Sequence, residues 1–164
     1  MYKRQERLRA AERHTDLKLG LGALSDIEWT AQLLQWQHGA HHAPVRAATG
    51  TRDALHALHH AGLLGRGDLL ALAETYDFLQ RLRNAAYLRT GLPGDTLPQP
   101  PAPGRPPTPE AERRLRALSR LVLPPQANAN DAANDAAARL RAEHARRTQS
   151  VRAVFRRLFL GEKG

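Results

Sequence analysis

Hydrophobic residues along this chain recur every three or four positions, which is the period of a helix that buries one side. The longest such run predicts a helix from about Asp68 to Arg89 that stops at Gly91. Its apolar positions step evenly through Leu69, Leu72, Tyr76, Leu79, Leu82 and Ala86. A single buried stripe of this length indicates a helix packed in a core.

Shorter stripes predict further helices over about 26–38, 51–61, 109–123 and 130–160. Thr51, Asp68 and Thr108 are the expected N-caps, and Pro109 suits a first helical position. Strands favour β-branched and aromatic residues, and these are scarce here. The sequence therefore predicts an all-α bundle of about five or six helices. The expected inward residues of the last two helices are Leu115, Leu118, Val122, Leu140, Val151, Phe155, Leu158 and Phe159.

Three other segments lack a strong apolar stripe. Residues 1–14 are rich in Arg and Glu and predict a charged helix. Residues 39–50 contain Pro44 and two glycines, and we expect a loop. Residues 92–109 hold eight of the eleven prolines, which predicts an extended or disordered Pro-rich loop acting as a spacer.

A shaped loop leads into the helix over 26–38. Gly20 and Gly22 allow backbone angles that other residues resist. Ser25 precedes Glu28 by three positions, the spacing of a capping box, in which each side chain accepts a hydrogen bond from the other residue's amide. The stripe of this helix is expected to contain Ile27, Ala31, Leu34 and His38.

Residues 16–38, DLKLGLGALSDIEWTAQLLQWQH, resemble the Lys-x-Gly-x-Gly-Gly-Leu-x-Asp-Ile-Glu-Phe/Trp signature of bacterial glutamine synthetase adenylyltransferases. Ala23 replaces the second glycine of the usual pair, and a positive φ there would cost about 1 kcal/mol or more. The resemblance continues well to residue 91 and weakly over 140–160. The matching signature positions are Lys18, Gly20, Gly22, Leu24, Asp26, Ile27, Glu28, Trp29, Gln32 and Gln35.

The resemblance implies a fold and a role. In that family the signature opens an all-helical domain that follows a nucleotidyltransferase domain. Residues 1–15 would then be a linker helix, and residues 16–164 the helical domain. The complete enzyme uses ATP and Mg²⁺ to move AMP onto a tyrosine of glutamine synthetase, and related domains reverse the reaction. The implied partners are a nucleotidyltransferase domain in cis or in trans, glutamine synthetase, and a PII-type signalling protein.

The family's catalytic Gly-Ser and Asp-x-Asp elements do not occur in this sequence. The Asp-x-Asp carboxylates hold the metal ions for attack on the α-phosphate. We therefore expect no catalytic residue and no cofactor in this chain, whether or not it works within an enzyme. The direction of the reaction also stays open.

The signature residues are instead expected to form an interdomain surface. This surface would comprise Lys18, Gly20, Gly22, Asp26, Glu28, Trp29 and Gln32. Asp26 and Glu28 also suit a helix start for purely electrostatic reasons. The sharper hypothesis is that one of them, with Lys18, faces the neighbouring domain and helps to shape its nucleotide or metal site.

Composition limits the other function classes. The formal net charge is +9 and there is no cysteine. No apolar run approaches the ~20 residues of a membrane span, so we expect a cytoplasmic protein. A basic helical nucleic-acid-binding protein is one alternative, although the arginines are dispersed and no reader motif accompanies them. A truncated gene product without activity is another.

Eight histidines make a metal-binding bundle the remaining alternative. Imidazole is a common zinc ligand, but no Cys, Asp or Glu completes either histidine cluster locally. We therefore favour solvated histidines and expect no metal site. The clusters are His38, His41 and His42, and His56, His59 and His60.

Overall fold

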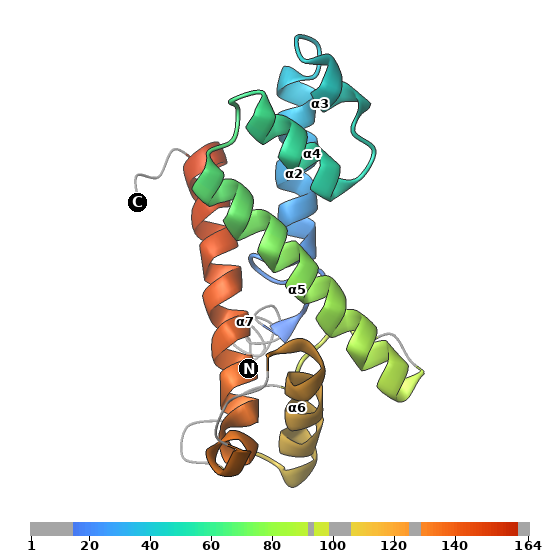
Figure 1. Ribbon diagram of the computed structural model, residues 1–164, viewed down its shortest axis with the longest axis vertical. Helices are drawn as coiled ribbons and strands as arrows, with labels where there is room; N and C mark the ends of the chain where they lie inside the picture. Colours follow the sequence, from blue (N-terminus) through green and yellow to red (C-terminus); the bar gives the residue numbers. More distant parts are fainter. Residues whose placement is uncertain (1–14, 92–93, 99–105, 125–128, 161–164) are drawn as a thin grey trace, which may run out of the picture. The chain divides into compact units, whose positions relative to one another are not determined.

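The computed structural model describes residues 15–91, 94–98, 106–124 and 129–160, with side chains in the last range from residue 136 onward. The predicted helix over 1–14 and much of the Pro-rich loop lie outside these residues. The described part confirms the all-α class, and its helices are labelled in Figure 1. They are α2 (Leu24–His38), α3 (Ala43–Ala47), α4 (Thr51–His60), α5 (Arg66–Thr90), α6 (Pro109–Val122) and α7 (Ala129–Leu160).

The chain divides into two compact units, and each takes residues from distant parts of the sequence. The first unit comprises 1–20 and 80–146, and the second comprises 21–79 and 147–164. Helices α5 and α7 therefore each contribute one portion to each unit. The signature stretch is likewise shared, because the boundary falls between Gly20 and Leu21.

In the second unit, α2, α3 and α4 pack against one another. The predicted stops of two helices are confirmed. Gly39 is the C-cap of α2, and Gly62 follows α4 with a φ of +73°. The Gly62 N–H donates to the His59 carbonyl, and the Leu63 N–H donates to the Leu58 carbonyl. The buried residues include Leu24, Ile27, Ala31, Leu34, Val45, Leu55, Leu58, Leu72, Leu79 and Val151.

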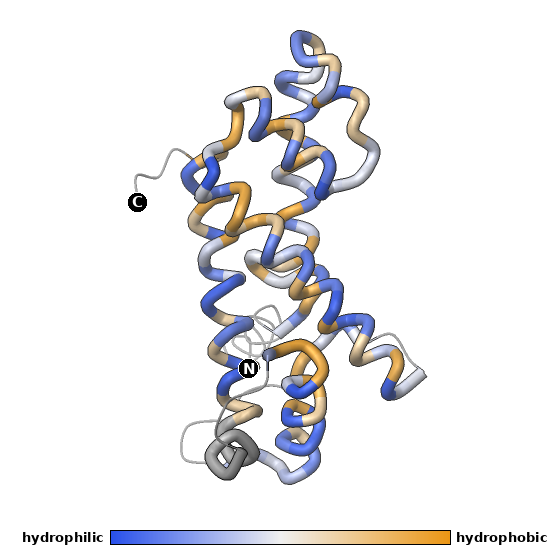
Figure 2. Tube along the Cα trace, viewed as in Figure 1, coloured by the Kyte–Doolittle hydropathy of each residue, from blue (hydrophilic) through white to orange (hydrophobic). Residues whose placement is uncertain are grey.

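In the first unit, α6 begins as predicted. The Thr108 hydroxyl accepts a hydrogen bond from the Ala111 N–H at 3.3 Å, and Pro109 occupies the first turn. Figure 2 shows hydrophobic and hydrophilic residues alternating along the helices, α6 among them. The predicted inward residues of α6 are all buried, namely Leu115, Leu118 and Val122.

Part of the predicted Pro-rich loop has a defined place. Asp16 and Thr96 form an isolated antiparallel bridge. The Leu17 N–H donates to the Asp95 carbonyl at 2.6 Å, and the Leu97 N–H donates to the Thr15 carbonyl at 2.9 Å. Leu97 is buried. Residues 94–98 are therefore extended, as expected, and they pair with the chain just before the signature glycines.

Three local predictions are wrong. Residues 43–47 form the short helix α3 where we expected a loop, because the fixed φ of Pro44 suits a first helical turn. Thr51 and Asp68 do not cap their helices. The carbonyls of Gly50 and Gly65 already accept helical hydrogen bonds, so α4 and α5 start earlier than the side chains indicated.

The core along α5 is wider than one stripe. Tyr76 is only half-buried, whereas Phe78 is almost fully buried and was not predicted. The Arg147 guanidinium lies 5.1 Å from the centroid of the Phe78 ring. Periodicity finds the centre of a buried face, but neighbouring helices determine how far the face extends.

Replacing Phe78 by Ala should lower the free energy of unfolding by about 3–5 kcal/mol, because it leaves a cavity in a closed core. Leu88→Ala is the matched control on the same helix. Leu88 is 83% exposed, so its truncation should change stability by less than about 0.5 kcal/mol. Urea unfolding followed by circular dichroism compares the two, and equal losses would contradict the assigned core.

Candidate functional site: the signature loop and helix α2

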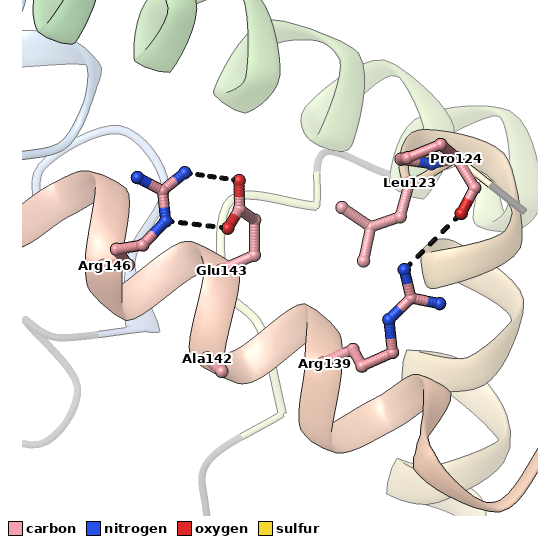
Figure 3. Close-up of a pocket in the computed structure, with 6 residues that line it drawn as sticks. All are labelled: Leu123, Pro124, Arg139, Ala142, Glu143 and Arg146. Carbon is pink, nitrogen blue, oxygen red and sulfur yellow. Dashed lines mark hydrogen bonds and ion pairs between the residues drawn. The ribbon is translucent and has the colours of Figure 1, made fainter. Parts of the chain in front are cut away.

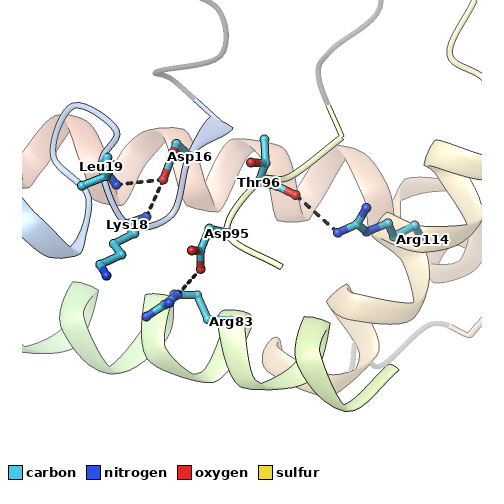
Figure 4. A network of polar contacts seen from close by, with 7 residues as sticks. All are labelled: Asp16, Lys18, Leu19, Arg83, Asp95, Thr96 and Arg114. Carbon is cyan, nitrogen blue, oxygen red and sulfur yellow. Dashed lines mark hydrogen bonds and ion pairs between the residues drawn. The ribbon is translucent and has the colours of Figure 1, made fainter. Parts of the chain in front are cut away.

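The signature loop begins with a carboxylate that organises the backbone. The Asp16 side chain accepts hydrogen bonds from the N–H groups of Lys18 and Leu19, both at 2.8 Å (Figure 4). This Asx-type turn bends the chain immediately after the bridge to Thr96. The Lys18 side chain is left exposed.

The extended segment 94–98, opposite Asp16, is held by two arginines. The Arg83 Nε donates to the Asp95 carboxylate at 2.6 Å, and an Arg114 N–H donates to the Thr96 carbonyl at 3.4 Å (Figure 4). Gly94 permits the close approach to α5, because a Cβ there would lie 2.8 Å from the Ala86 Cβ. The first half of the loop therefore rests on α5 and α6 through segment 94–98.

The second half of the loop depends on Gly22. Its φ is +73°, and a Cβ there would lie 2.0 Å from the Thr148 carbonyl oxygen of α7. Any side chain would therefore meet both backbone strain and a backbone clash. Gly20 is buried but does not have a positive φ. Ala23 has a φ of −83°, so replacement of the family's second glycine does not strain the loop.

The predicted capping box is wrong. Helix α2 starts at Leu24, its N-cap is Ala23, and no side chain caps it. Ala23 and Leu24 are both buried, so packing extends the helix past Ser25, which lies inside the first turn.

Asp26 takes over the role that the capping box gave to Glu28. Its carboxylate accepts a hydrogen bond from the Gly22 N–H at 2.7 Å, and an Arg152 nitrogen lies 3.7 Å from the same oxygen. A carboxylate in the first turn is also favoured by the helix dipole. Asp26 thus joins the loop, the start of α2 and α7.

The predicted interdomain residues divide into two groups. Gly22 and Asp26 are engaged within the chain, and Gly20 is buried. Lys18 and Gln32 are exposed, Glu28 is half-buried, and Trp29 is 59% exposed. The outward group is the part of the signature that a partner can touch.

The remaining signature glutamine is structural. The Gln35 side-chain nitrogen donates to the carbonyls of Val45 and Ala48, both at 2.9 Å. It satisfies two backbone acceptors at the end of α3 and ties that short helix to α2.

Sequence reasoning did not find four residues that shape the site. Asp16 had a local signal, since an Asp side chain can accept hydrogen bonds from the amides two and three positions later. Asp95 had only its place in the Pro-rich loop. Thr148 and Arg152 had none, because they lie more than a hundred positions from the loop they contact.

The histidine clusters have ordinary surroundings. The His59 Nδ1 lies 2.9 Å from the Leu64 carbonyl oxygen, and the His59 and His60 rings are 5.9 Å apart. Across the described ranges, no three His, Cys, Asp or Glu side chains gather as a metal site would need. No helix in the same ranges is long and apolar enough to cross a membrane.

Among the described residues of the first unit, two cavities bear on the site. The larger, of about 370 Å³, is lined by Arg139 and Arg146, whose guanidinium groups already make hydrogen bonds within the chain (Figure 3). Arg146 makes two hydrogen bonds with Glu143, and Arg139 donates to the Pro124 carbonyl. The smaller, of about 220 Å³, lies where Gly94 and Asp95 pass Arg83, Asn84 and Tyr87. Neither contains a nucleophile beside a base.

Comparison with known proteins identifies relatives of this sequence. The sequence model of the family described as GlnD PII-uridylyltransferase matches residues 1–159. The chain belongs to this family. Together with the relatives given next, this match confirms the resemblance to glutamine synthetase adenylyltransferases. No solved structure matches the chain.

Similar curated proteins carry one name, bifunctional glutamine synthetase adenylyltransferase/adenylyl-removing enzyme. The Mycolicibacterium smegmatis protein is 47% identical over 96 residues, which is 58% of this chain and 10% of the relative. The Streptomyces coelicolor protein is 46% identical over 97 residues, with 58% and 10% covered. The Nocardia farcinica protein is 36% identical over 155 residues, with 94% and 14% covered. The chain thus spans about a tenth of the length of these relatives.

Gly22→Ala should destabilise the protein far more than Gly62→Ala. Both glycines have a φ of +73°, but a Cβ at Gly62 would meet nothing within 4 Å. Gly62→Ala therefore measures backbone strain alone, about 1–2 kcal/mol. Gly22→Ala adds the clash with Thr148 and should exceed this loss by at least about 1 kcal/mol. Urea unfolding measures the difference, and equal losses would contradict the loop geometry.

Asp26→Ala should cost about 1–2 kcal/mol, because it removes a charged acceptor from a part-buried N–H. Asp26→Asn should cost less, since an amide oxygen can still accept from Gly22. Glu28→Ala is the control and should change stability by less than about 0.5 kcal/mol. Thermal or urea unfolding measures these losses of stability. A larger loss for Glu28→Ala than for Asp26→Ala would contradict this geometry and support the predicted capping box.

Proposed function

We propose that this chain acts as the helical accessory domain of a glutamine synthetase adenylyltransferase-like enzyme and supports catalysis carried out elsewhere. The observation that carries this proposal is the family match over residues 1–159, in a sequence without the Gly-Ser and Asp-x-Asp elements. The complete enzyme would move AMP from ATP to a tyrosine of glutamine synthetase, or remove it.

The chemistry would belong to a nucleotidyltransferase domain, in cis or in trans. That domain would bind ATP and Mg²⁺ through paired carboxylates. Lys18 is exposed and Glu28 is half-buried, so each is accessible to such a domain. Asp26 is the weaker candidate for shaping a nucleotide or metal site, because Gly22 and Arg152 already occupy its carboxylate.

Glutamine synthetase and a PII-type signalling protein are the further partners of this proposal, and the cytoplasm is the proposed location. A chain with a formal charge of +9 suits an acidic partner surface. The relatives named above are described as acting on glutamine synthetase, which supports that partner in particular.

A complementation assay tests the proposal. The Mycolicibacterium smegmatis enzyme lacking its matching segment is mixed with this chain, with labelled ATP and with glutamine synthetase. The chain alone should transfer no AMP. The mixture should transfer several-fold more AMP than the truncated enzyme alone, because the missing domain is supplied in trans.

The Gly22→Ala chain is the matched control and should restore less transfer. Binding of the chain to the truncated enzyme is measured in parallel by calorimetry. The proposal fails if the folded wild-type chain neither binds the truncated enzyme or glutamine synthetase nor changes the transfer rate.

A further inference from the structure

Helix α2 exposes both tryptophans of the chain. Trp29 is 59% exposed and Trp36 is 84% exposed, and there is no third tryptophan. They are seven positions apart, so they point in nearly the same direction and lie about 10 Å apart along the helix. Gln32 is also exposed, and Leu33 is half-buried between them.

This aromatic stripe lies opposite the core side of α2. Ile27 and Ala31 are buried and stand two positions from Trp29, roughly 200° around the helix. The helix therefore has two apolar sides. One packs within its own unit, while the other faces outward, where a surface helix normally carries charged residues.

The outward side is also unusual in charge. The chain contains 25 Lys and Arg residues, yet none occurs from Leu19 to Val45. Exposed positions beside the tryptophans are held by Gln32 and Gln37. Glu28 is the charged group of this side, and it makes no ion pair with any described residue. Aromatic enrichment with loss of lysine is typical of the centre of a protein interface.

We propose that this tryptophan face, made by Glu28, Trp29, Gln32 and Trp36, docks on the neighbouring nucleotidyltransferase domain. The inference rests on the proposed function and specifies the surface. The docking partner presents an apolar groove for the two indoles and a Lys or Arg opposite Glu28. Trp36 belongs to this face although it is not one of the matching signature positions, and Asp26 does not belong to it.

Charge complementarity selects this occupant over a second copy of the chain. In a symmetric dimer the same face meets itself. Two Glu28 carboxylates would then be buried without a cation, since the segment from Leu19 to Val45 supplies none. Relatives about ten times as long hold ample other polypeptide that can supply both the groove and the cation.

The two tryptophans allow the face to be observed directly. A chain labelled with 5-fluorotryptophan should give two ¹⁹F signals, one from each position of the face. Both should respond to solvent in the free chain, and both should shift when the unlabelled, truncated Mycolicibacterium smegmatis enzyme is added. Glutamine synthetase alone should leave them unchanged.

Variants then measure the face by calorimetry. Trp29→Ala and Trp36→Ala should each weaken binding to the truncated enzyme roughly tenfold or more, as aromatic anchors do. Leu88→Ala, at an equally exposed apolar residue of α5, should bind like the wild type. Glu28→Lys should weaken binding more than Glu28→Gln, whereas Glu110→Gln, at an exposed carboxylate of α6, should have no effect. Circular dichroism verifies that each variant is folded.

The outcomes separate this inference from the proposed function. If the wild-type chain binds the truncated enzyme but the ¹⁹F signals do not move and both tryptophan variants bind normally, the inference alone is wrong. If nothing binds, the proposed function fails with it. Signals that shift with the concentration of the chain alone would identify a second copy as the occupant. Signals shielded from solvent in the free chain would show that the chain covers its own face.

Discussion

The structure of the signature depends on one close contact, the packing of the Gly22 backbone against the Thr148 carbonyl of α7. A left-handed residue without a side chain is the one arrangement that lets the loop lie this near to another backbone. The Gly22 N–H then donates to the Asp26 carboxylate, and that hydrogen bond holds the loop against the first turn of α2, which the burial of Ala23 and Leu24 starts at Leu24. The core side of α2 begins at this first turn, where Ala23, Leu24 and Ile27 are buried.

This contact also decides which carboxylate of the signature is available. Asp26 is turned back to the loop and lies near Arg152, so its charge is used within the chain. Glu28 is two positions further along the helix, roughly 200° away, and makes no ion pair with any residue that the structure describes. Asp26 and Glu28 look equivalent in the sequence, but their surroundings in the structure differ. Asp26 holds the loop together, and Glu28 is the carboxylate that we propose for recognition.

The sequence predicted what depends on local periodicity and missed what depends on distant contacts. The stripe of α6, most of the stripe of α5, the Thr108 cap and the stop at Gly62 are local, and they were predicted correctly. The capping box at Ser25 was equally plausible locally, but the burial of Leu24 moved the helix start. The burial of Phe78, the pairing of Asp16 with Thr96 and the role of Thr148 arise from tertiary packing, which no local pattern encodes.

The two apolar sides of α2 show why the outward face needed the structure. In the sequence, the helix has one apolar side with Ile27 and Leu34 and another with Trp29 and Trp36, and either side could face a core. Only the burial of one side identifies the other as a surface. That surface is poor in cations within a chain of net charge +9, so long-range attraction to an acidic partner must act through other residues. The tryptophan face would contribute only at contact distance, through burial of the indoles and one ion pair. Binding through it should therefore depend weakly on salt, whereas recognition through the arginines should weaken steeply as salt rises.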